Sequence, residues 1–242
     1  MRTFASGLIS TLATAVVASS AYAEAAVPRP FSATYAVSFR GIGAGTITFD
    51  FARDAATGRY IYETHASPST LARLFVSKAA MERSVMTIDD SGTRPLEWKL
   101  EDGKSGNEGD GELHFDWSRN QVTGVVESKP VELTAEPGTQ DRSSISIAVT
   151  TALLRGIEPG TIPLIDDNRI KRYVYTKKET ATVDSALGKL DTVIYESTRE
   201  GGSSRTSRFW MAPSLEYLPV RAEQIRKGKV ETVMVLQKVE KP

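Results

Sequence analysis

Alternating hydrophobic and polar positions run through most of the chain and predict β-strands. From Phe31 to Phe39, aromatic or small apolar side chains occupy every second position, with mostly polar residues between them. Residues 46–51 repeat this pattern with larger side chains, because isoleucine and phenylalanine alternate with threonine and aspartate. A period of two puts the apolar side chains on one face, so each run predicts a half-buried strand.

The same pattern recurs along the rest of the chain, and short turns rich in Gly, Asp, Asn or Pro separate the runs. Neighbouring runs joined by such turns favour antiparallel pairing. We therefore expect about a dozen strands in a single β-rich domain over residues 24–242. The further runs are residues 59–66, 79–88, 95–100, 112–117, 121–126, 130–135, 162–167, 170–179, 190–198, 207–212, 217–226 and 230–239.

One segment has helical spacing instead. Over residues 143–155, apolar side chains recur every three or four positions, as Val149 illustrates within "SISIAVTTALL". Asp141 or Ser143 can cap the N-terminus of this helix, and Gly156 can end it. A shorter helical turn is predicted over residues 67–75.

A sheet of a dozen twisted strands must curl or split, and the amphipathic helix needs an apolar surface to cover. We therefore expect a mainly β fold, in which a strongly curved antiparallel sheet or open β-barrel carries the helix on its concave face or at its mouth. An outer-membrane barrel is the alternative. Charged residues such as Arg172 and Arg208 argue against it, because they interrupt strands that lipid would have to cover.

The first 23 residues resemble a secretory signal peptide. Arg2 precedes an apolar stretch that is too short to span a bilayer, and the small-x-small sequence ending at Ala23 is typical of a cleavage site. A buried N-terminal helix is the alternative. We expect the protein to be exported to the periplasm, with a mature chain that begins at about Glu24. We do not expect it to be an integral membrane protein.

Charge and cysteine content narrow the function further. Without residues 1–23 the chain has 29 basic and 30 acidic residues, which argues against a nucleic-acid partner and gives no support to a polybasic membrane anchor. The sequence has no cysteine, so disulfides, thiol catalysis and thiolate metal sites are excluded. The fold must instead depend on an apolar core, which a chain of this length can build.

Three alternate glycines in "SFRGIGAGTITFDF" (residues 38–51) raise the question of a phosphate-binding loop. A dinucleotide fingerprint needs a third glycine three positions after the second and a helix immediately afterwards, whereas here the sequence has Thr46 and then a strand. A hairpin turn or tight bend is the better interpretation. Gly43 and Gly45 would thin the apolar face, leaving room for a neighbouring side chain, the helix or a ligand.

No catalytic residue, cofactor site or metal site is predicted. His114 and Asp116 share one face of a strand, but two ligands do not make a metal site, and a solvated face is the simpler interpretation. Residues 102–112 have the composition of a calcium loop without its spacing. Acidic pairs such as Asp166 and Asp167 have turn contexts, and the sequence has no nucleophile elbow, zinc-protease motif or P-loop.

The aromatic residues are numerous enough to line a cavity beside the helix, although they can equally fill an ordinary core. Such a cavity would be apolar and would suit an acyl chain or another hydrophobic ligand. The candidate lining residues are Gly43, Gly45, Phe49, Trp98, Val149, Leu153, Phe209, Trp210 and Tyr217.

Three segments together resemble a known family. These are "GIGAGTITF", "QDRSSISIAV" and the ending "RFWMAPSLEYLPVRAEQIRKGKVETVMVL", of which the Phe-Trp-x-x-Pro segment leading to Tyr-Leu-Pro-Val-Arg (209–221) is the most specific. They are similar to a bacterial exported family designated domain of unknown function 3108. The resemblance implies an architecture like that of periplasmic lipoprotein carriers and receptors, whose open barrels hold acyl chains. It implies no catalytic residues.

These observations favour a periplasmic binding or envelope-maintenance protein without enzymatic activity, which holds a hydrophobic or lipid-like ligand. A protein-interaction or scaffolding module of the envelope is one alternative, since an exposed sheet edge can add a partner's strand. An enzyme acting on envelope polysaccharide is another, and it requires two converging carboxylates about 5–10 Å apart.

Overall fold

Fourteen antiparallel strands form one continuous sheet in the computed structural model, which describes residues 26–69, 80–104, 106 and 108–241. The described chain also contains one α-helix, α1 (Ser144–Leu154), and a short 3-10 helix, η2 (Pro213–Leu215). The strands are β1 (Phe31–Phe39), β2 (Ile42–Arg53), β3 (Tyr60–Pro68), β4 (Met81–Asp89), β5 (Gly92–Glu101), β6 (Gly111–Asp116), β7 (Gln121–Val126), β8 (Lys129–Thr134), β9 (Thr161–Asp166), β10 (Arg169–Ser185), β11 (Gly188–Arg199), β12 (Arg205–Ala212), β13 (Leu218–Arg226) and β14 (Lys229–Glu240).

The strand order is a meander interrupted once. Strands β1 to β8 pair in sequence, strands β9 to β14 pair in sequence, and β14 pairs with β1 to join the two series. The two edge strands, β8 and β9, do not pair with each other. The sheet is therefore strongly curved but does not close into a barrel. The predicted mainly β fold is confirmed, with fourteen strands rather than about a dozen.

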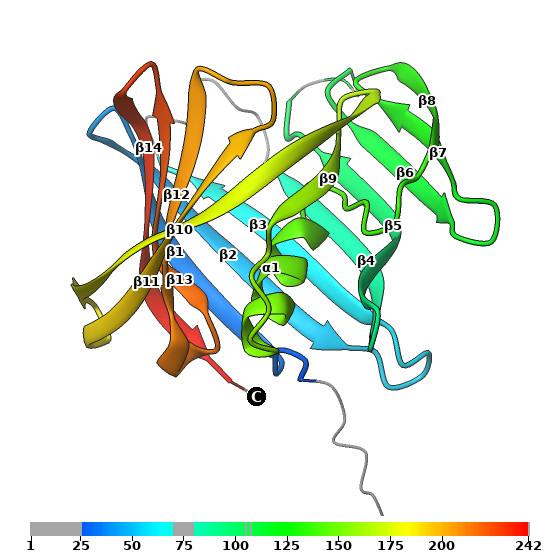
Figure 1. Cartoon of the computed structure of the whole chain (residues 1–242). Helices are drawn as coiled ribbons and strands as arrows, with labels where there is room; N and C mark the ends of the chain where they lie inside the picture. The colour runs from blue at the N-terminus through cyan, green and yellow to red at the C-terminus, as the bar shows by residue number, and fades with distance from the viewer. Residues whose placement is uncertain (1–25, 70–79, 105, 107, 242) are drawn as a thin grey trace, which may run out of the picture.

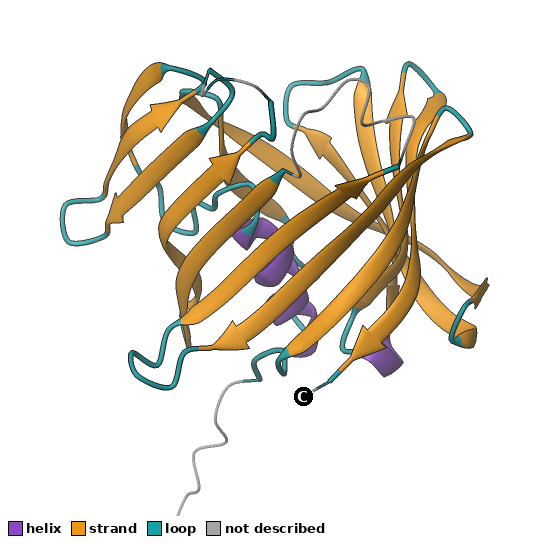
Figure 2. Cartoon of the chain, turned by 180° about the vertical axis from the view of Figure 1, so that it is seen from behind, coloured by secondary structure: helices purple, strands orange, loops and turns teal. Residues whose placement is uncertain are grey.

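Helix α1 lies on the concave side of the sheet (Figure 1). From behind, the helix is seen beyond the strands of the first series (Figure 2). It connects the two open edges, because it lies between β8 and β9 in the chain. A parallel bridge from Gln140 to Leu164 holds the approach to the helix against β9. The predicted position of the helix on the concave face is therefore confirmed.

Asp141, one of the two predicted caps, holds the N-terminus of α1. Its carboxylate accepts hydrogen bonds from the backbone N–H groups of Ser143 and Ser144 at 2.8 and 2.7 Å, and from the hydroxyl of Ser84 on β4 at 2.7 Å. Burial raises the pKa of this carboxyl to about 6, although these hydrogen bonds oppose the rise. The helix therefore begins at a buried polar contact with the sheet.

Both ends of α1 are fastened to the β4–β5 region. At the N-terminal end, the Gln140 amide donates to the Thr93 carbonyl at 2.8 Å. At the C-terminal end, the Arg155 guanidinium donates to the Asp89 carbonyl at 2.9 Å. These contacts fix the position of the helix along the concave face of the sheet.

Alternating burial in the strands follows the sequence pattern closely. In β6, Leu113 and Phe115 are buried, whereas His114 and Asp116 are exposed. Together with Trp98 and residues of β7 to β9, these two apolar side chains form a buried apolar cluster, which we call the filled cluster. The strands from β5 to β9 thus enclose an apolar core of their own.

Of the two glycines that the sequence analysis singled out, Gly43 and Gly45, only Gly45 occupies a position that a larger residue could not take. Its φ is +134°, and a Cβ there would lie 2.2 Å from the Ser67 carbonyl oxygen. Adjacent backbone of β3, rather than a ligand, therefore occupies the space beside it. The sequence predicts a helical turn over residues 67–75, but residues 67 and 68 belong to β3, and residues 70–75 lie outside the described residues. The predicted signal peptide, residues 1–23, also lies outside the described residues.

Candidate functional site

An apolar cavity of about 210 Å³ lies between α1 and the concave face of the sheet. The helix forms one side of it, and strands from both series form the others. No lining residue carries a charge. The lining consists of Phe31, Tyr35, Phe49, Tyr62, Ser146, Ile147, Val149, Thr150, Tyr175, Tyr195, Phe209, Met211, Leu218, Pro219, Ala222 and Met234.

Aromatic pairs build two walls of this cavity. On the β1–β3 wall, Phe49 packs edge-on against Tyr35 and stacks on Tyr62, with ring centroids 5.4 and 5.8 Å apart. On the opposite wall, Tyr175 of β10 stacks on Phe209 of β12 at 6.3 Å. Such ring contacts are worth about 0.5–1.5 kcal/mol each beyond area burial, so both walls are well supported.

Two of the tyrosine hydroxyls at the cavity form hydrogen bonds within the protein, and burial keeps them neutral. The hydroxyl of Tyr35 donates to the Pro219 carbonyl at 2.8 Å, and that of Tyr195 donates to the Glu158 carboxylate at 2.9 Å. Burial raises the pKa of both hydroxyls well above the usual range, and it raises the pKa of Tyr175 to about 12. The interior is therefore uncharged at physiological pH.

Three of the candidate lining residues from the sequence meet at this cavity: Phe49, Val149 and Phe209. They come from β2, α1 and β12, which are far apart in the chain. The sequence pattern placed each of them on an inward face, and the curvature of the sheet brings those faces together.

The remaining candidates lie elsewhere for identifiable reasons. Trp98 is buried in the filled cluster, where its indole N–H donates to Glu82 at 2.7 Å. Leu153 packs with Ile162 in a further buried cluster, and Tyr217 is partly buried against the same cluster. Neither of them belongs to the lining.

Trp210 and the two glycines are also outside the cavity. Trp210 neighbours Phe209 in the strand, so it points to the opposite face, where Arg208 and Arg221 approach its ring at 5.9 and 5.5 Å. Gly43 is exposed at the end of β2, and Gly45 faces the β3 backbone.

Several lining residues were missed from the sequence, although a signal for them existed. Tyr35 shares a period-two face with Phe31, and cross-strand pairing with Ile47 puts it on the same side as Phe49. Met211 is two residues from Phe209 and therefore shares its inward face. Knowing the strand register would have identified them.

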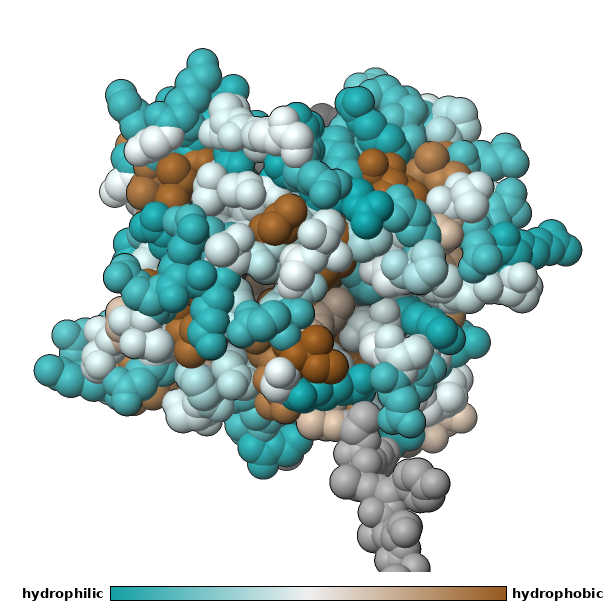
Figure 3. Space-filling view, viewed as in Figure 1, coloured by the Kyte–Doolittle hydropathy of each residue, from teal (hydrophilic) through white to brown (hydrophobic). Residues whose placement is uncertain are grey.

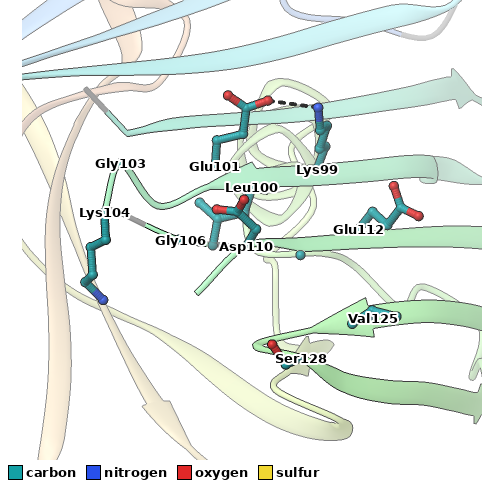
Figure 4. Close-up of a pocket in the computed structure, with 11 residues that line it drawn as sticks. Lys99, Leu100, Glu101, Gly103, Lys104, Gly106, Asp110, Glu112, Val125 and Ser128 are labelled. Carbon is teal, nitrogen blue, oxygen red and sulfur yellow. Dashed lines mark hydrogen bonds and ion pairs between the residues drawn. The ribbon is translucent and has the colours of Figure 1, made fainter. Parts of the chain in front are cut away.

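A second hollow is polar and open. This groove of about 460 Å³ lies between the turn after β5 and the β7–β8 turn. Figure 4 shows side chains of both charges around it, among them Lys99, Glu101 and Asp110, with an ion pair of 2.8 Å between Lys99 and Glu101. Its charged lining suits neither an acyl chain nor another apolar ligand.

The described residues offer little for metal or acid–base chemistry. They contain no group of three or more His, Asp or Glu side chains arranged to hold a metal ion. Asp166 and Asp167 are engaged by the Lys171 ammonium and the Arg142 guanidinium. The central cavity also has no carboxylate in its lining.

In the space-filling view, hydrophobic residues emerge near the centre of the front face, within mainly hydrophilic surroundings (Figure 3). Among the helices that the structure describes, none is both long enough and apolar enough to cross a bilayer.

Two solved structures of bacterial proteins match the chain, and they differ in how well they superpose. A β-barrel-like protein of domain of unknown function DUF1849 from Brucella abortus matches with a TM-score of 0.56 and 11% identity, covering 89% of this chain and 98% of that chain. A protein from Bacteroides fragilis, described as exported with a YmcC-like fold, matches with a TM-score of 0.36 and 10% identity, covering 90% and 100%. At such identities the first match supports the fold alone, and the second carries no argument.

No curated protein matches the sequence. A family profile does, and it matches residues 34–235, from the first strand of the sheet to the last. The match includes the helix and nearly all the strands that surround the cavity. The chain therefore belongs to the family described as "Protein of unknown function (DUF3108)".

Proposed function

We propose that the protein binds a hydrophobic, lipid-like ligand in the helix–sheet cavity and has no enzymatic activity. The observation that carries this proposal is the uncharged lining of the helix–sheet cavity, in which seven of the sixteen residues are aromatic. Ligand sites in proteins are mostly apolar and concave, with a few polar groups that fix orientation. Here we assign that role to the two helix residues with hydroxyl groups in the lining, Ser146 and Thr150.

The size of the cavity narrows the ligand class. A volume of about 210 Å³ is below the roughly 300–1,000 Å³ of pockets for drug-sized ligands. A single slender acyl chain, or the end of one, fits this space better than a fused-ring or two-chain lipid. Its polar headgroup would then remain outside the cavity, since the lining offers no charge to pair with it.

We also propose that the protein works in the periplasm as one domain over residues 24–242. The signal-like residues 1–23 support export. The pairing of β1 with β14 supports a single domain, because the first and last strands belong to one sheet. An envelope-maintenance role follows from this compartment and ligand class.

Native mass spectrometry of protein purified without detergent tests the proposal directly. We expect an added mass in the range of fatty acids or their esters, which organic extraction removes. The extracted protein should then take up a fluorescent fatty acid. Protein that is clean as isolated and also fails to take up the probe would contradict the proposal.

A matched pair of variants places the uptake in the cavity. Ala222→Phe inserts a ring into the lining and should weaken probe binding at least tenfold, because it fills the space that the chain would occupy. Gln237→Phe adds the same ring at an exposed position of β14 and should bind like the wild type. Equal affinities in the two variants would show that the probe binds elsewhere.

A further inference from the structure

Two neighbouring turns at one end of the sheet expose large apolar side chains. Phe39 and Ile42 flank the β1–β2 turn and are 48% and 64% exposed, and Val230 follows the β13–β14 turn and is 45% exposed. In Figure 1 these turns lie together at the upper left, beside the turn that joins β11 to β12. Exposed apolar residues are ordinary when scattered, but a group of them marks an interaction surface.

The strand register shows that these exposed apolar residues lie close together. Phe39 pairs with Ile42 on β2 and with Thr232 on β14, while Val230 pairs with Ile225 on β13. Since β2, β1, β14 and β13 are consecutive in the sheet, the three exposed side chains lie on neighbouring strands.

A row of basic residues crosses the same end of the sheet. Arg205 of β12 pairs directly with Arg226 of β13, which pairs directly with Lys229 of β14. All three residues are exposed. Like charges placed directly opposite one another destabilise a sheet, so this row costs folding energy and suggests an anionic partner.

The acidic residues nearby do not cancel this charge. Glu231 is paired with Arg40 at 2.8 Å. That hydrogen bond, with the charges of Arg226 and Arg205, lowers the pKa of the Glu231 carboxyl. Arg40, Arg226 and Arg205 therefore share the single negative charge of Glu231, so this group of charges stays positive overall. The β13–β14 turn adds a further cation, Lys227.

We propose that this hairpin-end surface, formed by Phe39, Ile42, Val230, Arg205, Arg226 and Lys229, docks on an anionic phospholipid bilayer. Basic side chains gain attraction at an anionic membrane surface, and exposed apolar side chains enter the boundary between headgroups and acyl chains. A soluble polyanion would use the charges alone, whereas the bilayer uses both features. The proposal does not require the cavity to hold a ligand.

Vesicle co-sedimentation of the whole chain tests the docking. We expect binding to vesicles of phosphatidylglycerol and phosphatidylethanolamine, and much weaker binding to pure phosphatidylcholine. Added salt should weaken the binding, because the charges are exposed and therefore screened. Equal binding to both kinds of vesicle, or to neither, would overturn the proposal.

The basic row is tested by the triple substitution of Arg205, Arg226 and Lys229 with serine. Each basic residue at an anionic surface is worth about fivefold in affinity, so the triple variant should lose roughly 100-fold. It should melt no lower than the wild type, because like-charge pairs are removed. Unchanged affinity for anionic vesicles would contradict the assignment.

A matched control removes three exposed basic residues elsewhere. Substituting Arg119, Arg169 and Lys189 with serine changes the net charge equally while leaving the hairpin-end surface intact. We expect this variant to keep most of the vesicle affinity. An equal loss in control and test variants would mean that net charge alone drives binding, and it would overturn the proposal.

The apolar contribution separates a membrane from a soluble polyanion. Phe39→Ser with Ile42→Ser should lower vesicle affinity at least tenfold, whereas Val125→Ser with Ile157→Ser, at exposed positions elsewhere, should not. If the first pair binds vesicles like the wild type and a sulfated polysaccharide competes fully, the surface is a polyanion site and the bilayer proposal fails.

Discussion

The two sides of helix α1 differ in how completely they are filled. On one side, β4 holds the helix through the contacts of Asp141 with Ser84 and of Arg155 with Asp89, and beyond it Trp98 and Leu113 belong to the filled cluster. On the other side, the helix faces a cavity of about 210 Å³. Protein interiors are normally close-packed. Because the helix is held firmly by hydrogen bonds on one side, we interpret the cavity on its other side as a local feature of the fold, and not as a sign of loose packing throughout.

The largest expected effect is the loss of a side chain from the filled side. Leu113→Ala should lower the free energy of unfolding by about 3–4 kcal/mol, because Leu113 is 2% exposed and its removal leaves a new void. Met234→Ala, at the partly buried cavity wall, should cost only about 1–2 kcal/mol. Chemical denaturation measures both. Equal losses would mean that the two sides are packed alike.

The polar anchor of the helix should respond to pH. The folded pKa of the Asp141 carboxyl, about 6, exceeds the unfolded value of about 3.9, so the folded state binds this proton more tightly. Its contribution to stability is therefore full below about pH 4 and is lost as the pH rises through 6, by up to about 3 kcal/mol.

Asp141→Asn removes this titration and isolates the effect. The difference in unfolding free energy between the wild type and this variant should change between pH 4 and pH 7 in favour of the variant, while all other titrating groups cancel. Denaturation at several pH values measures it. A difference that stays constant over this range would show that the carboxyl of Asp141 is not perturbed in the folded protein.

Larger side chains should also distinguish the two sides of helix α1, because the cavity has room for them and the filled cluster does not. Ala135→Leu, in the filled cluster, should cost about 1–3 kcal/mol, because a packed core resists extra methylene groups. Ala222→Leu, in the cavity lining, should change stability by less than about 1 kcal/mol. Thermal melts of the pair give the comparison. A large loss for Ala222→Leu would mean that the cavity wall cannot accept added volume.

A small effect is also expected on the outer face of the sheet. Trp210→Leu removes the cation–π contacts with Arg208 and Arg221 and should cost about 1 kcal/mol. Fatty-acid uptake should not change, because Trp210 points away from the cavity. Weakened uptake with an unchanged melting temperature would place this side chain in the binding path.

The sequence predicts the class of fold well because period-two burial is local. Leu113 and Phe115 alternate with exposed neighbours, and turn residues mark the strand ends. The helix is equally predictable, since Asp141 and the apolar spacing after it are consecutive in the chain. These are short-range regularities that a single sequence carries.

The cavity is predictable only in part because it depends on long-range register. Phe209 and Trp210 are adjacent and equally aromatic, yet only one of them points inward. Choosing between them requires the phase of β12 relative to β11 and β13, and the pairing of β12 with β13 changes register just after Trp210. Gly45 likewise faces β3 backbone, which no local pattern reveals.

The pairing of β1 with β14 has a consequence for folding. These strands lie at opposite ends of the sequence, so β1 remains an unprotected edge until almost the whole chain has been synthesised. Contacts this distant in sequence close late and slow the approach to the native state. The sheet is therefore completed by its last strand, and a chain truncated before Lys229 would expose β1 to pairing with other molecules.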